Sequence, residues 1–276
     1  MTTMSERTLA SPSNPRIKAA VRLRDRRERD ATGLTLVDGA RELRRALEAG
    51  VDMVEAFVCE PLLAGEDARA ALDALRGRDI KVTTTTEPAF AKLAFGDRSE
   101  GLLAVVRAPS LALDDLRIPA DPLILVMEGV EKPGNVGAVL RSADGAGVDA
   151  VIAASPRTDL ANPNVIRASA GTIFAVPMAA ASTAEVLVWL RDRSVRILAA
   201  RVDGTVAYTD ADLTGAVAIV VGSEVDGLTG AWQGAEVETI RLPMLGVADS
   251  LNVSVSAAIL VYEARRQRGG HVTEAD

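Results

Sequence analysis

Apolar runs alternate with helical patterns along the second half of the chain. The runs lie at 123–127, 150–154, 196–200, 217–221 and 237–242, and the helical patterns lie at 136–145, 164–169, 184–193 and 252–268. Uninterrupted apolar strands separated by helices indicate a parallel sheet that is covered on both faces. We therefore predict an α/β domain that binds any ligand beyond the carboxyl ends of its strands.

The first part of the chain predicts a smaller, mixed α/β domain. Its expected helices are 16–29, 39–49, 66–76 and 87–94, and its expected strands are 35–37, 53–58, 81–85 and 102–107. Prolines and aspartates without a clear period follow at 108–122 and indicate a linker. The predicted divisions are a first domain at 1–108, a linker at 109–122, a second domain at 123–268 and a tail at 269–276.

Composition narrows the possible chemistry. No apolar run approaches the roughly 20 residues that span a bilayer, and the N-terminus lacks an apolar signal core, so a soluble cytoplasmic protein is expected. The single cysteine, Cys59, and the single histidine, His271, argue against disulfides, thiolate zinc sites and a Ser-His-Asp triad. Cys59 lies in an apolar run and is expected to be a buried structural thiol. No metal is expected.

Positive charge is concentrated near the N-terminus although the net charge is −7. Five arginines and one lysine fall within 16–27, and Arg29 follows them. Such a density fits either a solvated helix face or a phosphate-binding surface, because each phosphate contact releases counterions. Arg22, Arg26 and Arg29 are the candidate RNA contacts, and Arg167, in V-I-R-A-S-A-G, is a further candidate.

The segment E-G-V-E-K-P-G-N-V-G-A-V-L-R-S-A, residues 128–143, follows a predicted strand and opens a helix. It lacks the Lys-Ser/Thr of a P-loop and the G-x-G-x-x-G of a dinucleotide fold, which disfavours both classes. Asn135 is either a helix cap or a site residue. Arg141 lies further along the same helix.

Two more segments follow strand ends. In V-V-G-S-E-V-D-G-L, residues 220–228, Gly222 would let a ligand approach the backbone, and Glu224 is either a site acid or a structural partner of Arg141. In I-R-L-P-M-L-G-V-A-D-S-L-N-V-S-V-S-A, residues 240–257, a polar stretch passes without a break into an apolar helix. That order indicates a helix N-terminus that presents Ser250 and Asn252 to a ligand.

These three segments, in this order, resemble the motifs of the SpoU/TrmH branch of the SPOUT RNA methyltransferases. The resemblance covers about 123–268, and it implies a parallel sheet with a trefoil knot. The first domain resembles the L30-like RNA-binding domain that these enzymes often carry. By motif position, the resemblance implies that S-adenosylmethionine is bound by Gly222, Leu242, Met244, Leu251 and Ala199.

The resemblance also implies the reaction, which is 2′-O-methylation of a ribose in RNA. Asn135, Arg141, Glu224, Ser250 and Asn252 would form the catalytic set. Arg141 would act as the proton acceptor, or else stabilise alkoxide charge or clamp a phosphate, since guanidinium is a poor base. A homodimer is expected.

The RNA substrate is expected to be ribosomal, most of all 23S ribosomal RNA. A role in resistance to a ribosome-targeting antibiotic, of the thiostrepton or avilamycin type, and a housekeeping role on ribosomal or transfer RNA both remain open. A non-catalytic ribosome-assembly factor is a further alternative. The full polar set argues against that last possibility.

Overall fold

The computed structural model describes residues 8–78, 80–95 and 100–269. These residues form two compact units. The first contains the chain up to Pro109 together with Asp159–Ala175, and the second contains Ser110–Thr158 and the chain from Val176 onward. The predicted tail at 269–276, which holds His271, lies outside the described residues except for Gly269.

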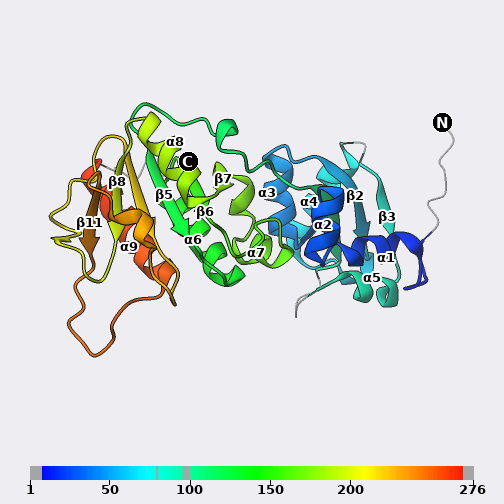
Figure 1. Cartoon of the computed structure of the whole chain (residues 1–276). Helices are drawn as coiled ribbons and strands as arrows, with labels where there is room; N and C mark the ends of the chain where they lie inside the picture. Colours follow the sequence, from blue (N-terminus) through cyan, green and yellow to red (C-terminus); the bar gives the residue numbers. More distant parts are fainter. Residues whose placement is uncertain (1–7, 79, 96–99, 270–276) are drawn as a thin grey trace. The chain divides into compact units, whose positions relative to one another are not determined.

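The first unit is built on a four-stranded sheet with the order β1-β4-β2-β3. β4 pairs antiparallel with β1 and with β2, whereas β2 and β3 are parallel. The strands are β1 (Leu34–Asp38), β2 (Met53–Val58), β3 (Val82–Thr84) and β4 (Leu102–Arg107). The helices are α1 (Pro15–Arg22), α2 (Arg26–Thr32), α3 (Ala40–Glu48), α4 (Gly65–Arg76), α5 (Glu87–Leu93) and the short η1 (Glu60–Leu62). Figure 1 shows these elements, coloured from blue to green-cyan.

The prediction of a single basic helix at 16–29 is wrong. α1 ends at Arg22, and α2 starts at Arg26, after three intervening residues of which the last, Asp25, is its N-cap. The side chain of Asp25 accepts a hydrogen bond from the Arg27 N–H at 2.9 Å, which is the usual way a short acidic residue begins a helix. Cys59 is fully buried in the apolar core of this unit, as predicted, and burial raises the pKa of its thiol.

Residues 159–175 are part of the first unit although they follow and precede strands of the second. They form α7 (Pro163–Ala168) and η3 (Thr172–Phe174). The Thr35 hydroxyl donates to the Ala161 carbonyl at 2.5 Å, and Arg45 donates to the Ala170 carbonyl at 2.7 Å. Hydrogen bonds between residues far apart in the sequence therefore hold the segment against β1 and α3.

The second unit contains a seven-stranded sheet with the order β7-β6-β5-β10-β8-β11-β9. Its neighbouring strands are all parallel, as predicted. The strands are β5 (Leu123–Glu128), β6 (Ala150–Ala154), β7 (Met178–Ala181), β8 (Arg196–Ala200), β9 (Val206–Ala207), β10 (Val217–Val221) and β11 (Val237–Arg241). β7 and β9 were not predicted from the sequence. β7 consists of one methionine and three alanines, and alanine has little preference for strands.

The helices of the second unit cover both faces of this sheet. They are α6 (Pro133–Gly145), α8 (Thr183–Asp192), α9 (Val253–Gln267) and the short η2 (Leu113–Asp115) and η4 (Gly230–Gln233). Every residue of β5 and of β10 is buried, so both faces of these central strands are covered. The predicted linker is not exposed throughout, because Leu113 and Leu116 pack on the apolar core of this unit. Among the described residues, no helix is both long and apolar enough to cross a membrane.

Candidate active site

The three predicted motif segments include loops at the carboxyl ends of β5, β10 and β11 in the second unit. β5 and β10 are neighbours in the sheet, and β8 separates β10 from β11. Carboxyl ends of parallel strands share one edge of the sheet, so loops far apart in the sequence meet there. The strand order of the sheet therefore brings the three motif segments to one edge.

Asn252 joins the three segments through its side-chain amide. The oxygen accepts from the backbone N–H of Ser254 at 2.9 Å and from its hydroxyl at 2.6 Å, which caps the N-terminus of α9. The amide nitrogen donates to the Asn135 side-chain oxygen at 3.3 Å and to a carboxylate oxygen of Glu224. Because the oxygen is committed to the cap, the amide nitrogen must face the other two motifs.

Asn135 is not a helix cap, so that alternative is wrong. The N-cap of α6 is Lys132, and Asn135 is the third residue of the helix. Glu224 forms an ion pair with Lys132, whose Nζ lies 3.4 Å from the second carboxylate oxygen. The sequence reasoning missed Lys132, although it lies inside the first motif segment. The structure does not support the alternative that Glu224 is a partner of Arg141.

Arg141 is exposed on α6. Within the described part of the chain, its guanidinium makes no hydrogen bond or ion pair, and its planar set of N–H donors is therefore open to a ligand. Arg141 thus lies outside the hydrogen-bonded group of Asn135, Glu224 and Asn252.

A cavity of about 370 Å³ opens at Glu224 and at Leu251 and Val253, the two neighbours of Asn252 in the chain. That volume lies in the usual range of small-molecule sites, roughly 300–1,000 Å³. It is lined by the loops that follow β8, β10 and β11 and by the start of α9. The predicted cofactor residues Gly222, Leu242, Met244 and Leu251, with Glu224 and Ser250 of the catalytic set, are among its walls.

Ala199 is not among the lining residues. It is fully buried in the apolar core, and the next residue, Ala200, faces the cavity instead. Gly222 has no room for a side chain, because an added Cβ would lie 2.3 Å from the Gly227 carbonyl carbon. The loop that begins at Gly222 therefore packs back on itself and presents its backbone.

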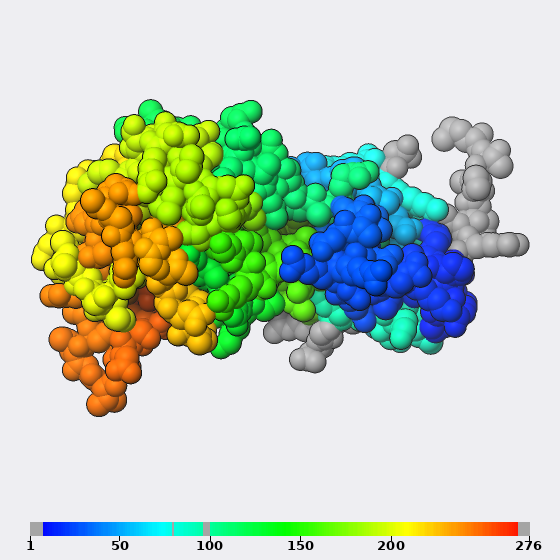
Figure 2. All heavy atoms as spheres, viewed as in Figure 1, coloured from blue at the N-terminus to red at the C-terminus, as the bar shows by residue number. Residues whose placement is uncertain are grey.

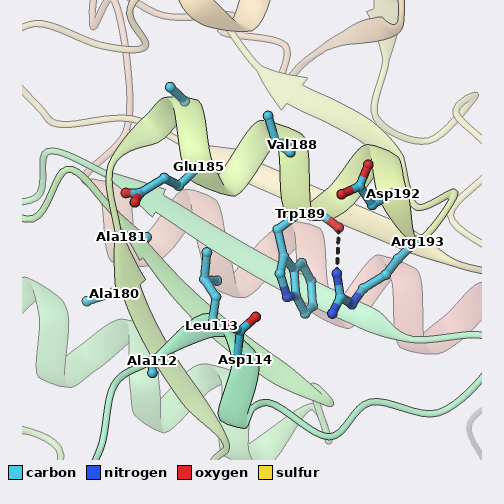
Figure 3. A pocket seen from close by; sticks show the side chains of 11 residues that line it. Ala112, Leu113, Asp114, Ala180, Ala181, Glu185, Val188, Trp189, Asp192 and Arg193 are labelled. Atoms are coloured by element: carbon cyan, nitrogen blue, oxygen red, sulfur yellow. Dashed lines mark hydrogen bonds between the residues drawn. The ribbon is translucent and has the colours of Figure 1, made fainter.

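A second cavity in the same unit contains none of the predicted site residues. Figure 3 shows it between η2, β7 and α8. Arg193 lies 4.1 Å from the centre of the Trp189 ring and donates to the Trp189 carbonyl at 3.3 Å. Arg193 and Trp189, which form part of the cavity wall, are therefore already paired with each other. The cavity beside Asn252 is the candidate active site.

The predicted RNA contacts in the first unit have different outcomes. Arg29 is 4% exposed, and its guanidinium pairs with Asp159 at 2.5 Å and donates to the carbonyls of Leu23 and Arg24, both at 2.8 Å. The prediction that Arg29 contacts RNA is therefore wrong, because a buried and fully engaged guanidinium cannot reach a phosphate. Arg22 and Arg26 are exposed, as an RNA contact requires.

Arg167 also has partners inside the first unit. Its Nη1 donates to the Phe95 carbonyl at 2.6 Å and lies 3.4 Å from an oxygen of the buried Asp38. A phosphate contact at this residue would have to replace those bonds, so the structure does not support the RNA-contact prediction for Arg167. Among the described residues, no group of three or more His, Cys, Asp or Glu side chains could hold a metal ion.

Comparison with known proteins defines the class. The SpoU rRNA Methylase family matches residues 122–262, and the MRM3-like substrate binding domain matches residues 14–104. The chain belongs to the SpoU rRNA methylase family. Its second unit carries the family's parallel sheet and motif loops.

Particular relatives extend the similarity over nearly the whole chain. A 23S rRNA (uridine(2479)-2′-O)-methyltransferase of Streptomyces viridochromogenes is 30% identical over 258 residues, which cover 89% of this chain and 87% of the relative. The crystal structure of an RNA 2′-O ribose methyltransferase superposes with a TM-score of 0.83 at 44% identity, covering 95% of this chain and 99% of the other. The SpoU methyltransferase AviRb from Streptomyces viridochromogenes, in complex with the cofactor AdoMet, superposes with a TM-score of 0.83 at 28% identity, covering 92% of this chain and 98% of the other.

Proposed function

We propose that this protein transfers a methyl group from S-adenosylmethionine to the 2′-hydroxyl of a ribose in 23S ribosomal RNA. The observation that carries the proposal is that the second and third motif loops line one cavity, while Asn252 joins both of them to the first motif by its bonds to Glu224 and Asn135. Family membership and the named activities of the relatives support the same reaction.

The cavity suits the cofactor. Leu242, Met244 and Leu251 offer apolar walls for an adenine ring, and the loop from Gly222 offers backbone groups. Arg201 also lines the cavity, and its buried Nη1 has no hydrogen-bond partner in the described chain. A ligand acceptor would relieve that unsatisfied donor after a small adjustment of the side chain.

When bound, S-adenosylmethionine supplies a sulfonium methyl group for in-line displacement. The protein's part is to hold the ribose oxygen in line with that methyl and to help remove its proton. Asn252, fixed by its cap and by Glu224, would orient the ribose and the start of α9. Arg141, with its donors open, would stabilise alkoxide charge or clamp the adjacent phosphate.

The assembly and cellular setting belong to the same proposal. The segment between β11 and α9 stands out from the second unit in Figure 2, and its Leu245 and Val247 are fully exposed. Exposed apolar side chains of this size favour a protein interface, and a second copy of the chain is the expected partner. We place the enzyme in the cytoplasm with its ribosomal substrate. A resistance role and a housekeeping role are both compatible with this chemistry.

Mass-spectrometric mapping of 23S ribosomal RNA incubated with the purified protein and S-adenosylmethionine tests the reaction. We expect one added methyl group, on a nucleotide whose 3′ linkage resists alkali because its 2′-hydroxyl is blocked. An alkali-sensitive linkage at the methylated nucleotide would contradict ribose methylation. Binding of S-adenosylmethionine without any methyl transfer would favour an assembly factor. Light scattering of the active protein tests the dimer, and a fully active monomer would exclude it.

A further inference from the structure

Glu128, the last residue of β5, is a buried carboxyl group without a cationic partner. It is 3% exposed, and no lysine or arginine of the described residues pairs with it. One oxygen accepts from the hydroxyls of Thr183 at 2.7 Å and Thr229 at 2.9 Å, and the other accepts from the backbone N–H of Thr229 at 2.8 Å. Burying a carboxyl group is costly unless hydrogen bonds compensate it, and these neutral donors supply the compensation.

Thr229 ends the loop that starts at Gly222 and forms one wall of the candidate active site. The loop is closed near its middle, where the Gly227 N–H donates to the Ser223 carbonyl at 3.0 Å and the Asp226 N–H donates to the Ser223 hydroxyl at 3.0 Å. It is held at its start by β10 and at its end by the two bonds from Thr229 to Glu128. Residues 222–228 all line the cavity between these anchors.

The loop also carries Glu224, which receives the amide of Asn252. Its position depends on both ends of the loop. With Thr229 detached, the loop would keep its internal bonds and the exposed ion pair of Asp226 with Arg157 at 2.8 Å, and Glu224 itself would be held only by Asn252 and Lys132. A shift of about 1 Å in a site residue can cost on the order of a hundredfold in rate.

We propose that Glu128 is a positioning residue of the methyl-transfer site, acting through Thr229 on the loop 222–228. Glu128 touches neither cofactor nor RNA in this role. It fixes the position of the loop 222–228, and with it Glu224, by accepting the two hydrogen bonds of Thr229. The proposal rests on the proposed function, because it assigns the loop to the cofactor site.

Thr183 offers a matched control. Its hydroxyl donates to the same carboxylate oxygen of Glu128, but it belongs to the first turn of α8 and not to the loop. Thr183→Val and Thr229→Val each remove one hydroxyl bond to the same oxygen of Glu128 and keep the side-chain shape. Thr183→Val also removes the bond between the Thr183 and Ser155 hydroxyls, so as a control it perturbs at least as many bonds. Thr229→Ser keeps both bonds of Thr229 and is the conservative rescue.

The experiment measures three quantities for each variant: amide hydrogen exchange of residues 223–228 without ligand, S-adenosylmethionine binding by calorimetry, and kcat and KM for ribosomal RNA. We expect Thr229→Val to speed exchange in the loop, to weaken cofactor binding about tenfold and to lower kcat, with little change in the KM for RNA. Thr229→Ser should behave like the parent protein. Thr183→Val should change cofactor binding less than about twofold, even if it lowers the melting temperature as much as Thr229→Val does.

Equal effects of Thr183→Val and Thr229→Val on the loop and on cofactor binding would overturn the proposal, since Glu128 would then act only on stability. Failure of Thr229→Ser to restore the parent values would also overturn it. The exchange measurement separates this outcome from failure of the proposed function. If the parent protein binds no S-adenosylmethionine, the function fails, whereas loop exchange still decides whether Glu128 anchors the loop.

Discussion

Arg29 of the first unit and Arg141 of the second unit are used in opposite ways. In the first unit, the guanidinium of Arg29 is buried against Asp159, and Arg24 donates to the carbonyls of Leu93 and Ala94 at the end of α5, both at 2.7 Å. In the second unit, Arg141 is exposed and has no polar partner among the described residues. Guanidinium groups already satisfied by the protein stabilise it, whereas one left open is available to a substrate.

The comparison teaches that the density of arginines in a sequence does not measure an RNA surface. The segment 16–29 is the most basic part of the chain, yet its last arginine is a core residue. The partner that buries Arg29 lies 130 residues away, so the local pattern contains no sign of it. The experiments below test this division between structural and substrate-binding arginines.

The largest effect is expected from Arg29→Ala, on stability. Removing one partner of a buried ion pair costs about 3–5 kcal/mol, because the remaining charge and carbonyls lose their donors. Urea denaturation followed by circular dichroism measures the change. Arg26→Ala is the control, since Arg26 is exposed and its pair with Asp30 spans 3.5 Å, so its loss should cost less than about 0.5 kcal/mol. Equal midpoints for the two variants would break the comparison.

Arg141→Lys is expected to affect activity most and stability least. Lysine keeps the charge but loses the planar fork, so the rate should fall about a hundredfold while cofactor binding is unchanged. Single-turnover rates against pH separate the possible roles. If Arg141 were a proton acceptor, lysine, with its lower intrinsic pKa of about 10.4, would retain activity that rises with pH. A low single-turnover rate of Arg141→Lys that does not change with pH would support the role that we expect, in which the planar guanidinium binds the alkoxide or the phosphate.

Asp38, in the first unit, gives an expectation for pH. Burial raises the pKa of this carboxyl to about 6, and nearby Glu100 and Glu42 act in the same direction, against the Phe95 N–H and Arg167. Because the folded pKa exceeds the unfolded value of about 3.9, the folded state holds the proton more tightly. Its free energy of unfolding therefore falls as pH rises from about 4 to about 6, by roughly 2 kcal/mol from this group.

Asp38→Asn tests that expectation. The variant lacks the titrating carboxyl, so the difference in stability between it and the parent should grow in the variant's favour from pH 4 to pH 6 and then stay constant. Urea midpoints at half-unit steps of pH measure it, with Asp73→Asn on α4 as a control in the same unit. A difference that does not change with pH would show that Asp38 does not titrate in this range.

The central sheet could be predicted from the sequence because its strands are uninterrupted apolar runs. β6, β8 and β10 have the predicted bounds. The same property hid one detail of the site, because a strand buried on both faces has no alternation to show which residue meets a cavity. Ala199 was therefore predicted where Ala200 lies. The position of 159–175 in the first unit was equally hidden, since it depends on contacts with β1 and α3.

The motif loops could be placed because their polar residues follow strand ends. The bonds of Asn252 to two other motifs could not be derived, since they depend on how the loops meet in space. Glu128 begins the first motif segment, but its role was not predicted. The sequence shows a single acid at the end of an apolar strand, but it does not show whether water or Thr229 donates hydrogen bonds to that carboxylate. The trefoil knot and the homodimer stay predictions.

The smallest effect is expected from removing exposed arginines of the basic segment, Arg22 and Arg26, whose ion pairs with Glu28 and Asp30 are both 3.5 Å long. For each phosphate that an arginine no longer neutralises, the slope of log affinity against log salt should fall by roughly 0.7–0.9. The double alanine variant should therefore bind ribosomal RNA more weakly at low salt, with cofactor affinity and stability unchanged. Arg107→Ala is the control, because Arg107 is an equally exposed arginine that pairs with Asp52 at 2.9 Å. A slope for the double variant no flatter than that of the control would make Arg22 and Arg26 part of a solvated helix face, and Arg141 the main arginine to test for contact with RNA.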